Sequence, residues 1–183
     1  MKKKFWTSAK LLSLSALFVS LATLFVFVYQ TNLIRKQQYM SVYPHLNMGN
    51  HNSESLNYKF VLKNEGVGPA FIKSVEIEHL DGSVYESFVD YLDERITEKD
   101  SVYFHYSDLY EGQLISANEE LILFGLSDKS YTKAHGLPEN TIRGGNKLRA
   151  MLNTDSLSYK ITYESIYEEA WTLVNDSEIP VKN

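Results

Sequence analysis

The chain has 183 residues, of which 44% are hydrophobic, and its formal net charge is −5 at pH 7. Residues 1–39 hold six of the 18 Lys and Arg residues and no acid, so the remainder has 12 basic against 23 acidic residues, a net charge of −11. Phosphate backbones and anionic headgroups repel such a segment, which excludes nucleic acid as the expected partner. The absence of cysteine excludes disulfides, thiolate metal sites and cysteine lipidation.

An uncharged apolar segment follows the basic N-terminus. Residues 11–29 are dominated by Leu, Val, Phe and Ala, and a helix of that length spans about 28 Å, which matches the hydrocarbon core of a bilayer. A cleaved signal peptide is the alternative, because Ser20 and Ala22 have cleavage-site spacing, but that cut would leave residues 23–29 as an exposed apolar end. We therefore predict an uncleaved signal-anchor, a transmembrane helix at residues 11–29 in contact with the lipid bilayer.

The charges on either side of this segment predict its orientation. Trp6 and Tyr29 bracket the segment as interfacial aromatic residues, and only Arg35 and Lys36 follow it closely. Four lysines and the amino terminus precede it: Lys2, Lys3, Lys4 and Lys10. The positive-inside rule then predicts that residues 1–10 are cytoplasmic and that the C-terminal part is extracytoplasmic.

The rest of the chain divides into a stalk and one domain. Residues 30–42 contain helix formers without Gly or Pro, so we expect the helix to continue as a stalk until Pro44. About 140 residues remain, the usual size of a single domain, which we place at residues 43–175 with a tail at residues 176–183.

The first half of the domain reads as two strands and a helix. Apolar residues alternate from Leu56 to Leu62 and a second strand is expected at residues 71–80. Between them lies the turn Asn-Glu-Gly-Val-Gly-Pro-Ala at residues 64–70, in which Gly66 and Gly68 can take positive φ. Residues 84–98 have helical apolar spacing, at Tyr85, Phe88, Val89, Leu92 and Ile96.

The second half reads mainly as strands. We expect strands at residues 102–106 and 121–126, a surface loop at residues 127–140 that ends near Arg143-Gly144-Gly145, and a short helix at residues 147–152. A terminal hairpin follows, from the alternating residues 157–163 through the loop 164–169 to residues 170–174. The predicted fold class is mainly β, an antiparallel β-sandwich with one or two added helices after the transmembrane helix.

Candidate sites are few, and each has a simpler structural interpretation. Residues 66–69 resemble a phosphate loop but lack the following lysine, and Arg143, Lys147 and Arg149 form a small basic patch that a solvated loop also explains. The histidines at 45, 51, 79, 105 and 135 have no zinc spacing. Four acids share the polar side of the predicted helix: Asp90, Asp93, Glu94 and Glu98.

Aromatic residues offer one further candidate. Five of them, Tyr110, Tyr131, Tyr163, Tyr167 and Trp171, would form a recognition surface if they were exposed, because Tyr and Trp are common in binding hot spots. Core packing of the terminal hairpin is the alternative. We assign no catalytic, cofactor-binding or metal-binding residue, and expect no cofactor.

Four segments together resemble a family: the stalk Arg35–Tyr39, Val42-Tyr43-Pro44, the turn Asn64–Ala70, and the hairpin Tyr163–Trp171 with its Tyr-x-Ser-Ile-Tyr motif. The chain resembles uncharacterised bacterial single-span membrane proteins with a C-terminal β-sandwich-like domain. In those proteins the hairpin loop looks like Ser-Ile-Tyr-Gly-Glu, often near cysteines, whereas this chain has Glu168 and no cysteine. The resemblance implies a fold and a membrane anchor but no activity.

Three hypotheses for the function remain open. The first is a non-enzymatic interaction or accessory protein, anchored in a bacterial inner (cell) membrane, whose extracytoplasmic domain binds another membrane or envelope protein. The second is a small-ligand binding or sensing module, with the ligand between the helix at residues 84–98 and the sheet. The third is a hydrolase with a dispersed site.

Overall fold

The computed structural model describes residues 7–51, 58–96, 104–126, 140–152, 157–175, 177 and 179–183. The chain forms two compact units, Met1–Ser41 and Val42–Asn183. After the first helix the fold is mainly β, with two antiparallel sheets and two short helices among the described residues, as predicted.

The first unit contains one continuous helix. Helix α1 runs from Ser8 to Ser41, so the predicted apolar segment and stalk are one element of 34 residues. None of its residues is buried, and large apolar side chains such as Phe18 and Phe25 are at least three-quarters exposed. Among the described residues, α1 alone is long and apolar enough to cross a membrane.

The first sheet of the second unit has four strands. Its order is β1 (Leu46–His51), β2 (Lys59–Asn64), β7 (Glu120–Leu126) and β5 (Phe104–Tyr106), all antiparallel. Phe60, Leu62 and Asn64 face the interior, in register with Phe124 and Leu121 of β7 and with Leu46 of β1.

The second sheet is built around the longest strand, β3 (Ala70–His79). One side of β3 pairs with β8 (Leu157–Glu164), which leads through β9 (Ala170–Val174) to β10 (Val181–Lys182). The short strands β4 (Val84–Tyr85) and β6 (Leu114–Ile115) also pair with β3, at opposite ends of it.

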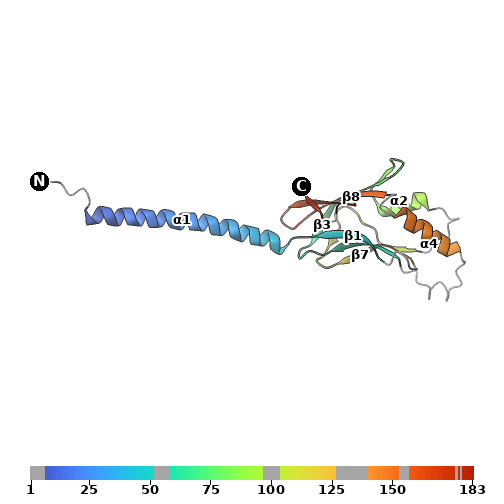
Figure 1. Cartoon of the computed structure of the whole chain (residues 1–183), viewed down its shortest axis with the longest axis horizontal. Coiled ribbons are helices and arrows are strands. Elements are labelled where there is room, and N and C mark those ends of the chain that lie inside the picture. Colours follow the sequence, from blue (N-terminus) through green and yellow to red (C-terminus); the bar gives the residue numbers. More distant parts are fainter. Residues whose placement is uncertain are drawn as a thin grey trace. The chain divides into compact units, whose positions relative to one another are not determined.

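One hydrophobic core lies between the two sheets. Phe60 and Tyr159, from opposite sheets, have ring centroids 6.4 Å apart, and Phe88 of a helix lies against both Phe60 and Phe124. Helices α2 (Phe88–Arg95) and α4 (Asn140–Met151) close one end of the sandwich, and the turn between β8 and β9 lies at the other (Figure 1). Edge-to-face aromatic contacts add to the burial of apolar area here.

The predicted helix at residues 84–98 is shorter than expected. Residues 84 and 85 form β4, and α2 starts only at Phe88, because the Ser87 hydroxyl accepts a hydrogen bond from Asp90 N at 3.1 Å and caps the helix. Its buried face contains Phe88, Tyr91 and Leu92, whereas Val89 is only half-buried. Residues 97 and 98 lie outside the described part of the chain.

The predicted short helix at residues 147–152 begins earlier than expected. Helix α4 starts at Asn140 and runs through Gly144-Gly145, so the prediction of a loop ending at these residues is wrong at this point. Each glycine costs about 1 kcal/mol of helix propensity relative to alanine. Burial of Leu148 and Leu152 in the core compensates for that cost.

The turn after β2 does not use glycine in the way predicted. Gly66 and Gly68 do not have positive φ, which among described glycines occurs only at Gly82 and Gly112. Instead, a Cβ at either position would overlap the backbone of residues 42–45. These glycines therefore permit a close approach of two backbone segments.

Candidate functional site

The two ends of the sandwich differ in their polar contacts. We call the end that contains residues 42–46 and the turn 64–69 the proximal end, and the end that contains α2, α4 and the turn after β3 the distal end. The strand register defines these two ends. β2 ends and β3 begins at the proximal end, and β3 runs from there to the turn at the distal end.

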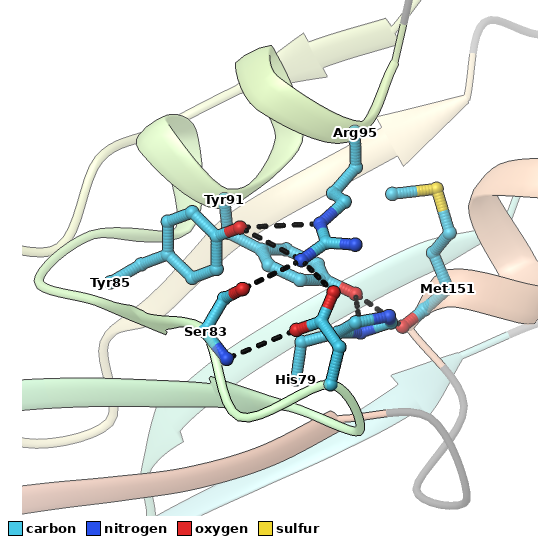
Figure 2. Close-up of polar contacts among 7 residues, drawn as sticks. His79, Ser83, Tyr85, Tyr91, Arg95 and Met151 are labelled. Atoms are coloured by element: carbon cyan, nitrogen blue, oxygen red, sulfur yellow. Dashed lines mark hydrogen bonds and ion pairs between the residues drawn. The ribbon is translucent and has the colours of Figure 1, made fainter.

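A polar cluster at the distal end is centred on Arg95, in the last turn of α2. Its Nη2 lies 2.6 Å from Asp81 Oδ2 and donates to the Ser83 hydroxyl at 3.1 Å. Nε and Nη2 both donate to the hydroxyl of Tyr85, at 3.2 and 3.1 Å. The guanidinium thus joins α2 to the turn after β3 and to β4 (Figure 2).

The charges in this cluster stabilise each other. Hydrogen bonds from Ser83, and then the Arg95 guanidinium, hold the pKa of Asp81 well below its usual range. Hydrogen bonds to Asp81 and Tyr85 raise the pKa of Arg95. Both side chains are partly exposed, so solvent screens their attraction.

Tyr91 links the same region to α4. Its hydroxyl donates to the carbonyl of Met151 at 3.2 Å and lies 3.3 Å from His79 Nδ1. Because the hydroxyl has one proton and the carbonyl can only accept, the second contact requires that His79 Nδ1 carry a proton and donate to the Tyr91 oxygen. Burial raises the pKa of Tyr91, so it stays a neutral donor.

This cluster has the properties of a structural cross-link. The Ser83 hydroxyl is held by a guanidinium, which activates no nucleophile, and the imidazole of His79 is hydrogen-bonded to Tyr91 rather than to a serine. Arg95 and Tyr91 together tie the turn after β3, β4, α2 and the end of α4 to each other. The arrangement fixes the distal end of the domain.

A second polar centre, at the proximal end, is the buried Asn64. Its Oδ1 accepts from the backbone N–H groups of His45 and Gly66, at 3.1 and 3.0 Å. Its Nδ2 donates to the carbonyls of Gly68 and Ile115, at 2.8 and 3.1 Å. All four hydrogen-bonding positions of the amide are filled, and its orientation is unambiguous because N–H groups only donate and carbonyls only accept.

The aromatic candidates separate into two groups. Tyr163 and Trp171 are core residues, stacked on each other at 5.9 Å, as the core interpretation predicted. The hydroxyl of Tyr163 accepts from Leu46 N at 3.4 Å, and burial raises its pKa. Tyr110 and Tyr167, in contrast, are 57% and 45% exposed, and Tyr131 lies outside the described residues.

The remaining candidates do not converge. Asp90, Asp93 and Glu94 are exposed on α2, while Glu98 and His135 are outside the described residues. Within the part of the chain that the structure describes, no three His, Asp or Glu side chains are placed to hold a metal ion. Residues 66–69 form the turn that holds residues 42–45, and this packing explains their glycines.

Sequence reasoning did not anticipate the Arg95 cluster or the Asn64 centre. Asp81-Gly82 is a turn signal in the sequence, and Asp81 Oδ1 accepts from Ser83 N, which is the expected side-chain contact of an Asp in a turn. The signal for Asn64 is its strand position, where a polar residue occurs on the apolar face. Comparison with protein-family models, curated proteins and solved structures finds no match to this chain.

Proposed function

We propose that the chain is a single-pass, membrane-anchored protein of the bacterial cell envelope whose extracytoplasmic β-sandwich binds another membrane or envelope protein and has no enzymatic activity. The observation that carries the proposal is α1, an apolar helix without a buried residue. Its apolar side chains need a lipid environment, because their exposure to water would cost about 25 cal/mol of free energy per Å² of apolar surface.

The polar clusters of the domain support a binding role over a catalytic role. The functional groups of Asn64, Arg95 and Tyr91 are committed to other groups of the same domain. Between α2 and the sheets lie Phe88 and Leu92, each at most 1% exposed, so the ligand-sensing alternative gains no support from that place.

The first experiment tests on which side of the membrane the C-terminal domain lies. In spheroplasts that express the chain with a C-terminal tag, we expect external protease to remove the tag without lysis. A cytoplasmic protein of known location serves as the control for intact spheroplasts. Removal of the tag only after lysis would contradict the extracytoplasmic placement and the choice of envelope partners.

A further inference from the structure

Apolar side chains are exposed at the proximal end of the sandwich. We call the following residues the proximal patch; their exposed fractions lie between 45% and 65%: Val67, Tyr110, Leu114, Ile166 and Tyr167. They come from three separate connections, the turn after β2, the segment before and in β6, and the turn between β8 and β9. Isolated exposed apolar residues are common on proteins, but a contiguous group is typical of an interaction site.

The strand register brings these connections together. Phe71 of β3 lies opposite Leu114 of β6 on one side and opposite Glu164 of β8 on the other. Directly opposite residues point to the same face of a sheet, so Leu114, Phe71 and Glu164 form a row on the outer face. The turn after β2 joins this row through Asn64, whose amide donates to both Gly68 and Ile115.

Carboxylates surround the patch. Lys73 lies 2.9 Å from Glu164, and its pKa is raised first by Glu164 and also by Glu168 and Glu111. Lys73 forms its ion pair with Glu164, whereas Glu111 and Glu168, which directly follow Tyr110 and Tyr167 in the chain, are exposed. Other lysines at this end are engaged elsewhere, since Lys63 and Lys182 each form an ion pair with a glutamate of their own.

The outer face of the second sheet is different away from the patch. There, exposed polar residues alternate along β3 and β8, and Lys160 lies 3.6 Å from Glu76. At the distal end, Leu80 and Val84 are exposed apolar residues that flank the turn held by Arg95. These two residues provide a matched control for the patch.

We infer that the proximal patch binds a cationic segment of a partner membrane protein, one that carries Lys or Arg beside apolar side chains. This inference rests on the proposed function and adds the surface and the chemistry of the partner. Apolar contacts would supply the central part of the interface, and Glu111 and Glu168 would supply specificity and a faster association rate for a cation.

A lipid surface is a poorer match for the patch. Anionic headgroups repel the same carboxylates. The charge of the patch therefore favours a protein partner.

Photocrosslinking in native membranes tests the inference. The full chain carries p-benzoylphenylalanine at position 166 or 114, or at position 84 as the distal control. We expect adducts from positions 166 and 114, and the crosslinked partner peptide, identified by mass spectrometry, should contain Lys or Arg. Glu111→Lys/Glu168→Lys should reduce the adduct yield about tenfold, because like charges would then face each other.

Each variant is first shown to be folded by the thermal unfolding of the purified full chain, followed by Trp171 fluorescence. Adducts with lipid, with a second copy of this chain or with an acidic peptide would overturn the inference, as would a yield unchanged by the two lysine substitutions. Adducts only from position 84 would overturn the proximal patch while leaving the proposed function intact. The absence of adducts from all three positions would overturn both.

Discussion

The proximal and distal ends of the sandwich are both held by polar side chains, but these side chains differ in burial. Asn64 is fully buried and makes four hydrogen bonds to the backbone of three segments. Arg95 makes as many contacts, yet it and Asp81 are 24% and 48% exposed. A lost contact costs more where water cannot replace it, so the same number of hydrogen bonds stabilises the two ends unequally.

The two ends of the sandwich also differ in the side chains that they expose. At the distal end the polar cluster is itself at the surface, and Leu80 and Val84 stand beside it. At the proximal end the polar centre is internal, and the surface displays the apolar patch. Burying the hydrogen bonds of Asn64 leaves the proximal surface available for contacts with a partner.

Replacement of the buried amide gives the largest expected effect. Asn64→Ala leaves two N–H groups and two carbonyls without their partners in the core, and we expect the free energy of unfolding to fall by about 3 kcal/mol or more. Urea unfolding followed by Trp171 fluorescence measures it. The exposed Asn47→Ala is the control, expected within about 0.5 kcal/mol of the unchanged chain; equal effects of the two would contradict a special role for the proximal centre.

Next in size is the close backbone approach at the same end. Gly68→Ala places a Cβ against the backbone of Val42, which cannot move without disturbing residues 42–45, so a loss of about 2–3 kcal/mol is expected. Gly49→Ala is the matched control, since an added Cβ there meets nothing within 4 Å. If both substitutions were neutral, the two backbone segments would not be in the contact described.

At the distal end we expect a smaller, pH-dependent effect. The pKa of Asp81 is lower in the folded chain than in the unfolded chain, where it is about 3.9. The stabilisation by this carboxylate is therefore fully present above about pH 4 and is lost as the pH falls towards the folded pKa. Asp81→Asn should reduce the fall in melting temperature between about pH 4 and pH 2.

The double variant Asp81→Asn/Arg95→Gln provides the control for that prediction. If Arg95 stabilises the fold mainly through Asp81, the double variant should lose no more free energy of unfolding than the two single variants lose in sum. A melting temperature of Asp81→Asn that follows the unchanged chain at every pH would show that the cluster does not stabilise the fold.

The smallest expected effect is a gain of stability from a substitution beside the patch. Glu168 has φ of 61°, the left-handed region that glycine adopts most easily, in the turn where Ser165 N donates to Glu169 O. Glu168→Gly should raise stability by about 0.5 kcal/mol, since relief of strain exceeds the entropy cost of glycine. Ile166→Gly, at an ordinary φ, should lower it, and calorimetry distinguishes the two.

Strands whose apolar residues alternate were predictable from the sequence, including the short β5 and β9, whereas β1, which is as long as β2, was not. Tyr159, Ile161 and Tyr163 alternate with polar residues and define β8. In β2, Phe60 and Leu62 have the same spacing, although Val61 between them is also buried. By contrast, β1 has only Leu46 and Met48 as inward residues, with Gly49 and Asn50 beside them. It forms because its backbone can pair with the edge of the sheet at β2. Local propensity does not contain that information.

The polar centres were not predictable for a related reason. Asp81 and Arg95 are 14 residues apart, and Asn64 and Ile115 are 51 apart, so their contacts depend on the completed fold. The start of α2 is different, because Ser87 followed by Asp90 three residues later is a capping pattern visible in the sequence. The exposure of Tyr110 and Tyr167, against the burial of Tyr163 and Trp171, required the structure to distinguish them.

Only one residue separates the end of α1 from Tyr43, the first residue after it that hydrogen bonds fix to the domain. This short connection has a mechanical consequence. Ser41 ends the helix, and two residues later the Tyr43 carbonyl accepts from Val67 N and Gly68 N, while its ring meets the edge of Trp171 at 5.3 Å. A pulling force applied to the chain at Ser41 would thus reach both sheets almost at once. It would load several hydrogen bonds and a ring contact in parallel, so the junction should resist tension better than a single strand peeled bond by bond.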